Sequence, residues 1–549
     1  MEMMKLPWEP SCKSGMARNT LFIRRVTNLL IVLWAVVAVP TTLAQTYTGM
    51  PTWHNDIART GQNLQETILT PANVNSTTFG KIFSYAVDGD IFGQPLFVYN
   101  VAIAGKGTFN VVYVVTENDS VYAFDADGMN SGPLWQDVFI NPSKGITPIP
   151  CADTGSNPNC PYLTIIGISG TPVIDMTSGT MYLVAATKEN GKYVQRLHAL
   201  DITSGAEKFG GPVVITASVK GTGAGSKNGR VAFSALHENQ RTGLLLQNGV
   251  VYMGWASYGD VAPFHGWVLG YNASTLARAV VLNTTPNGSD GGVWQSGGAF
   301  SVDPLGFIYL QTGNGTFDVN TAGKDRGDSF LKLNAATLKV ADYFTPFNQS
   351  ILDSSDLDLG SGAGVIVPTQ SGKFPNEIIS AGKQGVIYVV NRSKMGKFNA
   401  TTDHVIQKLQ GSARGYWSSA AYWNNNVYFS GRSDFLSQYS LSSGLLSTSA
   451  VSQAPTQFFF GSTPAISANG TSNGIVWALE RPVKIKGQVP PAILHAYNAT
   501  NVSQEIYNSG QAGTRDVPGP AITFAIPTVM NGKVYVGSQM ELDVYGILP

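Results

Sequence analysis

A strand-rich unit recurs along the chain at irregular intervals of roughly 40 to 50 residues, and this repeat limits the possible folds more than any other feature. Each copy combines a short entry strand, a strand with a Val-Tyr or similar pair, a strand that ends at an Asp or Asn turn, and an outer strand. Two examples are FNVVYVVTENDSVYAFDADG and GTMYLVAATKENGKYVQRLHALDITSG. Four strands in such a unit are typical of a propeller blade, and about eight copies are present. The pattern predicts an all-β, eight-bladed β-propeller over residues 79–549.

The two ends of the repeat region complement each other. The last copy, GKVYVGSQMELDVYGILP, stops at Pro549 after its third strand, whereas FGKIFSYAVDG near residue 80 is an outer strand without inner strands of its own. Pairing these segments would remove both free edges. We therefore expect the N-terminal strand to complete the last blade and close the ring.

The composition supports many short strands and excludes some partners. The chain has 60 glycines, only 13% charged residues and a formal net charge of zero. Abundant glycine and few charges are compatible with tight turns between strands. A neutral chain gives no electrostatic reason to expect nucleic acid or an anionic membrane surface as a partner.

Residues 1–44 are predicted to be a leader with a secretory signal peptide. Arg24 and Arg25 precede an apolar run at residues 29–39, and small residues lead to a cleavage point near Ala44. The apolar run is short for a membrane span, so we expect a secreted or periplasmic mature chain without one. The following residues, 45–78, are rich in turn formers and predict an irregular segment on the domain surface.

The cysteines predict one disulfide. Cys12 lies in the leader, which leaves Cys151 and Cys160 as an even pair on either side of the loop ADTGSNPN. In an exported protein such a pair is expected to form a disulfide that clamps the loop. A metal site is disfavoured here, because no other Cys or His lies at ligand spacing.

Several enzyme classes lack their motifs in this chain. The six histidines are scattered without an HExxH pattern, and neither a Gly-x-Ser-x-Gly elbow nor a Gly-x-Gly-x-x-Gly turn is present. A polar run, HENQR at residues 237–241, precedes an apolar strand. An exposed loop between blades is the favoured interpretation of this run, and a position lining the central opening of the ring is the alternative.

The residues most suited to chemistry lie between positions 291 and 358. Trp294 follows a glycine pair in GGVW, Asn314 stands in the turn TGNG, and Asp353, Asp356 and Asp358 are spaced along DSSDLD. An indole offers a large flat contact surface to a planar ligand. Amide and carboxylate oxygens are the ligands that a calcium-like ion prefers.

The repeat with its AFDADG and ALDITSG turns resembles the eight-bladed quinoprotein alcohol dehydrogenases. This resemblance implies two cofactors, pyrroloquinoline quinone (PQQ) and a calcium or lanthanide ion. It also implies that Trp294 stacks on the quinone, because the family carries its stacking indole in a similar Gly-Gly-x-x-Trp strand. The family's Thr-Gly-Asn turn corresponds to TGNG and implies that Asn314 is a metal ligand.

The acidic and basic motifs of the family also have counterparts. Its Asp-x-x-Trp-Asp-x-Asp segment resembles DSSDLD, which implies that Asp356 is the catalytic base and a metal ligand and that Asp358 is a further ligand. Its Lys-Asn-Gly strand start resembles AGKQG, which implies that Lys383 faces the quinone oxygens. An ion and an ammonium there would polarise the quinone while a carboxylate takes the hydroxyl proton of the substrate.

The sequence departs from the family pattern at several positions. Ser257 or Tyr258 stands where the family has a glutamate metal ligand, with Asp260 a weaker substitute nearby, and Ser355 replaces the tryptophan before the base. The adjacent-cysteine disulfide of many members is absent. Asn314 also begins an Asn-x-Thr sequon, and a glycosylated amide could not bind a metal.

Two functions therefore stay open. One is a PQQ-dependent oxidoreductase that oxidises an alcohol or sugar hydroxyl and passes electrons to a separate acceptor. The other is a non-catalytic propeller that binds a protein or glycan, since a fold alone does not fix a function. On that view Trp294 fills the core, Asn314 and the aspartates form turns, and Lys383 is a surface lysine.

Overall fold

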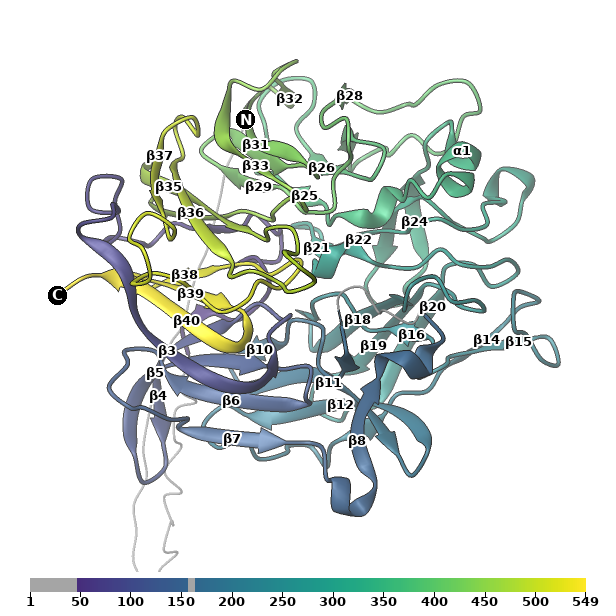
Figure 1. Ribbon diagram of the computed structural model, residues 1–549. Helices are drawn as coiled ribbons and strands as arrows, with labels where there is room; N and C mark the ends of the chain where they lie inside the picture. The colour runs from purple at the N-terminus through teal and green to yellow at the C-terminus, as the bar shows by residue number, and fades with distance from the viewer. Residues whose placement is uncertain (1–46, 157–162) are drawn as a thin grey trace, which may run out of the picture. The chain divides into compact units, whose positions relative to one another are not determined.

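A computed structural model describes residues 47–156 and 163–549. The predicted leader and Cys160 lie outside the described residues. The described chain is almost entirely strand, and its sheets form the eight blades of a β-propeller (Figure 1). The predicted fold class is confirmed.

The first four blades follow one another along the chain, each as an antiparallel sheet. Blade 1 contains β4 (Leu96–Ile103), β5 (Gly107–Val115), β6 (Ser120–Asp125) and β7 (Trp135–Val138). Blade 2 contains β10 (Val173–Asp175), β11 (Thr180–Glu189), β12 (Lys192–Asp201) and β13 (Val213–Val214), with β8 (Ile146–Pro150) and β9 (Ile165–Ile166) added beside β11. Blade 3 contains β17 (Leu245–Gln247), β18 (Val250–Ser257), β19 (Trp267–Asn272) and β20 (Arg278–Asn283), with β16 (Glu238–Asn239) also paired to β18. Blade 4 contains β21 (Ser301–Val302), β22 (Phe307–Gln311), β23 (Phe330–Asn334) and β24 (Val340–Phe344).

The remaining blades repeat the same order. Blade 5 contains β25 (Val365–Ile366), β26 (Glu377–Ala381), β27 (Val386–Asn391) and β28 (Gln407–Gln410). Blade 6 contains β29 (Ala421–Trp423), β30 (Asn426–Ser430), β31 (Asp434–Ser442) and β33 (Ser452–Phe458), with β32 (Leu445–Leu446) beside β31. Blade 7 contains β34 (Ala465–Asn469), β35 (Ser472–Glu480), β36 (Ile493–Asn498) and β37 (Glu505–Asn508). Blade 8 contains β38 (Thr528–Met530), β39 (Lys533–Gly537), β40 (Gln539–Ile547) and β3 (Phe79–Asp90).

A few short elements lie outside the blades. The strands β14 (Ser218–Lys220) and β15 (Arg230–Ala232) form a separate hairpin. The helical elements are α1 (Gln349–Ser354) and the 3-10 turns η1 (Pro142–Lys144), η2 (Cys151–Thr154), η3 (Gln295–Gly297), η4 (Val319–Thr321) and η5 (Leu359–Ser361). No helix among the described residues is long and apolar enough to cross a membrane.

The apolar runs of the sequence form the middle strands of the blades because both faces of these strands are covered. All six residues of β6 are buried, as are seven of the eight in β18. One apolar cluster joins Tyr535 of blade 8, Phe97 of blade 1 and Met181 of blade 2. Strands that are buried on both faces show continuous rather than alternating apolar residues, and this explains the VVYVV-like runs of the repeat.

Strand β3 closes the ring. It pairs antiparallel with β40, from Phe79 opposite Ile547 to Asp90 opposite Gln539, and the purple and yellow strands lie side by side in Figure 1. The predicted closure is confirmed. Since β40 would otherwise be an open edge, this pairing satisfies its backbone groups.

The first part of the segment before β3, residues 47–66, does not lie on the surface as predicted. Its carbonyls accept backbone N–H groups from the innermost strands in blade order. Tyr99 donates to Thr48, Ile174 to Pro51, Val302 to Ile57, Ile366 to Ala58, Tyr422 to Thr60 and Ile466 to Gly61, all at 2.7–2.9 Å. In addition, β1 (Gly49–Met50) pairs with β4, and β2 (Gln62–Asn63) pairs with β34. Residues 47–66, which we call the axial segment, therefore line the inner edges of the blades.

The surface position predicted for the axial segment was wrong because it was inferred from polar, turn-forming residues. Trp53, His54 and Arg59 are at most 2% exposed. The inner edge of each blade carries backbone N–H groups without a further strand to accept them, and buried donors of this kind need acceptors. A turn-rich segment supplies carbonyls in varied directions, so it fits the centre of the ring.

Blade 7 contains a buried ion triad that should make stability depend on pH. His495 lies 3.1 Å from Glu480 and 2.6 Å from Glu505, with its side chain 4% exposed. Burial lowers the pKa of His495, but these two carboxylates outweigh burial and raise the pKa overall. A raised pKa contributes stability that is full below the unfolded pKa of about 6.5 and is lost as pH rises through the folded pKa.

We expect the His495→Gln variant to lose about 2 kcal/mol at pH 5.5 and clearly less at pH 9. A fully buried pair would cost about 3–5 kcal/mol, and the partial exposure of both carboxylates reduces this. Urea unfolding at the two pH values measures the difference. The exposed His404→Gln is the matched control, and an equal loss for His495→Gln at both pH values would contradict the charge assignment.

Candidate functional site

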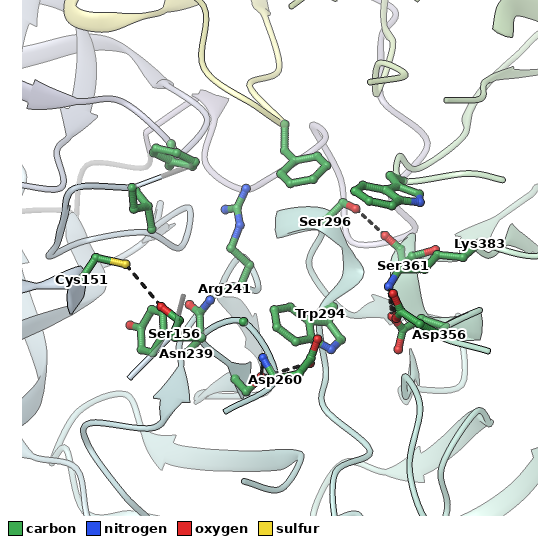
Figure 2. Close-up of a pocket in the computed structure, with 18 residues that line it drawn as sticks. Cys151, Ser156, Asn239, Arg241, Asp260, Trp294, Ser296, Asp356, Ser361 and Lys383 are labelled. Carbon is green, nitrogen blue, oxygen red and sulfur yellow. Dashed lines mark hydrogen bonds and ion pairs between the residues drawn. The ribbon is translucent and has the colours of Figure 1, made fainter. Parts of the chain in front are cut away.

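A cavity of about 320 Å³ is lined by residues from connections around the ring, from Phe92 after β3 to Phe524 before β38 (Figure 2). This volume is at the lower end of the range for small-molecule sites. Its aromatic lining residues are Phe92, Tyr258, Trp294, Trp417 and Phe524. Its charged lining residues are Arg241, Asp260, Asp356, Asp358 and Lys383.

The turns that carry Trp294 and Asn314 are bonded to each other. The N–H of Gly291 donates to the Asn314 carbonyl at 2.6 Å, and the N–H of Gly313 donates to the Gly292 carbonyl at 2.8 Å. Trp294 immediately precedes η3, and Asn314 follows β22. Thus GGVW and TGNG, which are separated along the chain, lie side by side, and Trp294 contributes to the part of the cavity lining that we call the floor.

The predicted basic and acidic residues also meet at this floor. Lys383 Nζ lies 2.5 Å from Asp356 Oδ1 and 2.5 Å from Asp358 Oδ2. Asn314 donates its backbone N–H to Asp358 at 2.7 Å and its Nδ2 to Asp356 at 3.2 Å. The fold therefore brings together Asn314, Asp356, Asp358 and Lys383 near Trp294. Of the predicted residues, Asn314 and Asp353 do not line the cavity.

Gly313 allows this close packing. A Cβ at this position would lie 2.2 Å from Asp358 Oδ1 and 3.0 Å from Trp294 Cδ1. Both distances are shorter than van der Waals contact, so a larger residue would displace the carboxylate or the indole. The glycine of the TGNG turn is thus required by the site itself.

Exposure distinguishes the two carboxylates. The Asp356 side chain is 71% exposed, whereas that of Asp358 is 9% exposed. Burial lowers the pKa of Lys383, but Asp358 and Asp356 raise it overall, so the ammonium is retained. Asp356 is therefore the carboxylate that a bound substrate could reach. Asp358 is buried and forms an ion pair with Lys383.

Ser257 and Asp260, which the resemblance places near a glutamate ligand of the family, are hydrogen-bonded to each other. Ser257 is fully buried at the end of β18, and its hydroxyl accepts the N–H of Asp260 at 2.9 Å. Burial raises the pKa of Asp260, and the nearby Asp358 raises it further. Among the described residues no group of three His, Cys, Asp or Glu side chains is arranged to hold a metal ion. The metal role of Asn314, Asp356 and Asp358 stays a prediction.

The HENQR run is not the exposed loop that the sequence favoured. Glu238, Asn239, Gln240 and Arg241 are 1–8% exposed, and both Asn239 and Arg241 line the cavity. Residues 238–239 form β16, which pairs with the end of β18 and draws the polar residues inward. The polar residues of this run predicted a solvent-exposed loop, but they lie at a buried site.

Arg241 is a buried cation that faces the cavity. Its guanidinium lies 5.3 Å from the Phe92 ring and 5.6 Å from the Phe524 ring, and its Nη1 donates to the Ser169 carbonyl at 3.3 Å. Its Nη2 has no hydrogen-bond partner among the described residues. Burial lowers the pKa of Arg241 to about 10, which leaves it protonated near neutral pH. Arg241 and Lys383 flank Trp294 in Figure 2.

Trp417 is a further lining residue, and its sequence did not predict a place in the site. It lies between β28 and β29, with Lys383 Nζ 5.4 Å and the Arg432 guanidinium 4.7 Å from its ring. Nothing in its local sequence, ARGYWSS, marks it as different from a core tryptophan. Only the arrangement of the blades places it opposite the lysine.

Cys151 also lines the cavity, at the start of η2. It is disulfide-bonded, and its predicted partner Cys160 lies outside the described residues, so the pairing stays a prediction. The loop that follows Cys151 thus begins at the cavity wall.

Comparisons with known proteins support the fold. No protein-family description matches the chain, and no curated protein matches it in sequence. Among solved structures, it is similar to the quinohemoprotein alcohol dehydrogenase ADHIIG from Pseudomonas putida HK5 (TM-score 0.58, 14% identity, covering 91% of this chain and 80% of that one). It is also similar to the quinohemoprotein alcohol dehydrogenase from Comamonas testosteroni (TM-score 0.57, 14% identity, 92% and 81% coverage). A europium-containing methanol dehydrogenase gives a TM-score of 0.58 at 14% identity, with 90% and 98% coverage. The predicted resemblance in fold is confirmed.

Proposed function

We propose that the protein is an exported quinoprotein-type dehydrogenase that binds PQQ in this cavity and oxidises an alcohol or sugar hydroxyl. The observation that carries the proposal is the donor set of the cavity. Aromatic rings enclose a space with a buried, incompletely paired arginine on one side and a lysine–carboxylate group on the other. The similarity to solved quinoprotein dehydrogenases supports the same conclusion at the level of fold.

The residues fit a flat, polycarboxylic quinone. Trp294 offers an indole face, and the free donor of Arg241 suits a carboxylate, which guanidinium binds well. Lys383 would face the quinone oxygens. When bound, the quinone would accept the electrons removed from the substrate carbon, because the redox chemistry belongs to the cofactor.

Asp356 is proposed as the base. It is the exposed carboxylate of the floor, so it can accept the hydroxyl proton of a substrate in the cavity. The buried Asp358 forms an ion pair with Lys383, which also contacts Asp356 and limits its movement. Electrons would then pass to a separate acceptor.

A calcium or lanthanide ion does not fit this carboxylate pair as it is arranged. The Lys383 ammonium already lies between Asp356 and Asp358, and Asn314 turns its NH₂ group toward Asp356. No step of the reaction is therefore assigned to a metal.

The proposal is tested by titrating purified protein with PQQ and following tryptophan fluorescence and cofactor absorbance. We expect a 1:1 complex. Replacement of Arg241 by glutamine should weaken PQQ binding by about 10- to 100-fold, because a charge-assisted hydrogen bond contributes about 1.5–3 kcal/mol.

Arg278→Gln is the matched control, since it removes an exposed arginine from β20 outside the cavity and should leave PQQ affinity unchanged. Arg241→Lys keeps the positive charge and serves as a second test variant if Arg241→Gln does not fold. The absence of a saturable PQQ complex with the unmutated protein, in metal-free and in calcium-containing buffer alike, would refute the proposal.

A second candidate function is binding without turnover. It is favoured by Ser257, whose hydroxyl bonds to the turn at Asp260 in place of a glutamate ligand. A stable PQQ complex that oxidises no alcohol or sugar in a dye-linked assay would support this candidate. A complex that turns over would exclude it.

A further inference from the structure

We propose that the Lys383 ammonium takes the place of a metal cation in this cavity, so that the site operates without a divalent or trivalent ion. The part of this inference that concerns cofactor binding rests on the proposed function. The part that concerns the lysine stands on the arrangement of the floor.

The ammonium lies where a cation shared by the two carboxylates would lie. Lys383 Nζ is 2.5 Å from an oxygen of Asp356 and 2.5 Å from an oxygen of Asp358. A calcium ion binds carboxylate oxygens at about 2.3–2.6 Å. An ion at this position would therefore overlap the ammonium, and the two cannot share the pair.

The other polar groups at the pair are hydrogen-bond donors. Asp358 accepts the backbone N–H of Asn314, and Asp356 accepts the Nδ2 of the same residue. The Asn314 Oδ1 is buried and has no hydrogen-bond partner within the described part of the chain. One ammonium leaves the carboxylate pair with a formal charge of −1, and these donors stabilise the remaining negative charge.

Two structural features hold the lysine in this position. The backbone N–H of Lys383 donates to the Asp358 carbonyl at 2.9 Å, which fixes the start of its side chain. Its Nζ lies 5.4 Å from the Trp417 ring, and its side chain is only 17% exposed. Such a lysine is part of the floor, unlike a mobile surface lysine.

The site also lacks a carboxylate at Ser257, where the family resemblance implies a metal ligand. A calcium-like ion requires about six to eight oxygens, and the blade 3 strand that faces the cavity supplies the buried Ser257 with its hydroxyl engaged by Asp260. A cation fixed covalently to the chain needs no such set. An ammonium held between Asp356 and Asp358 and a serine at position 257 are therefore consistent with each other.

Terbium binding tests the inference without PQQ. Tb³⁺ replaces calcium and lanthanide ions and luminesces when a nearby tryptophan, such as Trp294, is excited. We expect no saturable emission from the unmutated protein. The Lys383→Ala variant should gain a 1:1 site with a Kd of about 10⁻⁴ M, because the two freed carboxylates form a weak oxygen site.

The matched control is Lys408→Ala, which removes a lysine from its ion pair with the single carboxylate of Asp403 and should gain no site. Saturable Tb³⁺ binding by the unmutated protein that is lost in Asp358→Asn would overturn the inference. So would a folded Lys383→Ala variant without a gained site. If the Lys383→Ala variant does not fold, the inference is tested by whether the unmutated protein binds Tb³⁺ at this site.

PQQ titration separates this inference from the proposed function. With EDTA present we expect the unmutated protein to bind PQQ, and added calcium should leave the Kd unchanged. Binding that occurs only with calcium would overturn the inference and leave the proposed function standing. No PQQ binding under either condition would refute the proposed function, and the terbium result would then decide the role of Lys383.

Discussion

Replacing Asp356 by asparagine should lower kcat/KM for dye-linked alcohol oxidation by about 10²- to 10⁴-fold, the usual contribution of a general base. The PQQ affinity should change little, because an asparagine has nearly the same shape as the aspartate it replaces and Lys383 would keep its ion pair with Asp358. A kinetic assay with PQQ-loaded protein measures the first quantity, and a fluorescence titration measures the second.

Asp353→Asn is the matched control for this prediction. Asp353 lies in α1, three residues before Asp356, and its side chain does not line the cavity. We expect its kcat/KM to equal that of the unmutated protein. If Asp356→Asn were equally active, the base would have to be another group, and the assignment would be wrong.

The second large effect is expected in the axial segment. Trp53 is 2% exposed and packs in a cluster with Ala299, Ala363, Ala465 and Ile526 from four blades. The Trp53→Ala variant should lower the free energy of unfolding by about 4 kcal/mol, because a buried aromatic side chain and its contacts are lost and a cavity remains. Urea unfolding measures the change.

Limited trypsin digestion shows whether this loss releases the axial segment. Arg59 is 1% exposed and donates to the Phe300 carbonyl at 2.8 Å, so the unmutated protein should resist cleavage after Arg59. Cleavage there should appear in Trp53→Ala. The control is Trp423→Ala in blade 6, which removes an equally buried tryptophan and should reduce stability without exposing Arg59. Equal cleavage in both variants would show global unfolding instead.

Ring closure was predictable from local pattern alone. The strand near residue 80 lacked inner partners and the last copy lacked an outer one, and β3 pairs with β40 as this mismatch requires. Edge strands have strong unsatisfied hydrogen-bonding groups, so two incomplete edges in one chain leave few alternatives. The order of Trp294, Asn314, Asp356 and Lys383 similarly placed them in neighbouring blades.

Arg241 shows where such patterns fail. Its sequence neighbours are His, Glu, Asn and Gln, which are typical of an exposed loop, yet β16 pairs with β18 and turns the run toward the cavity. The axial segment was placed on the surface for the same reason. In both cases a polar residue requires hydrogen-bond partners, and its type does not determine whether water or the protein supplies them.

The sequence by itself determined the propeller and its closure, because strand periodicity and turn chemistry are local properties. The residues around Trp294 followed from the resemblance of their motifs to one family. Only the tertiary structure decided that Lys383 lies between Asp356 and Asp358, that Arg241 faces the same cavity, and that residues 47–66 lie within the ring. Those relations depend on distances between blades, which no spacing along the chain encodes. They arise when eight sheets pack around a common centre.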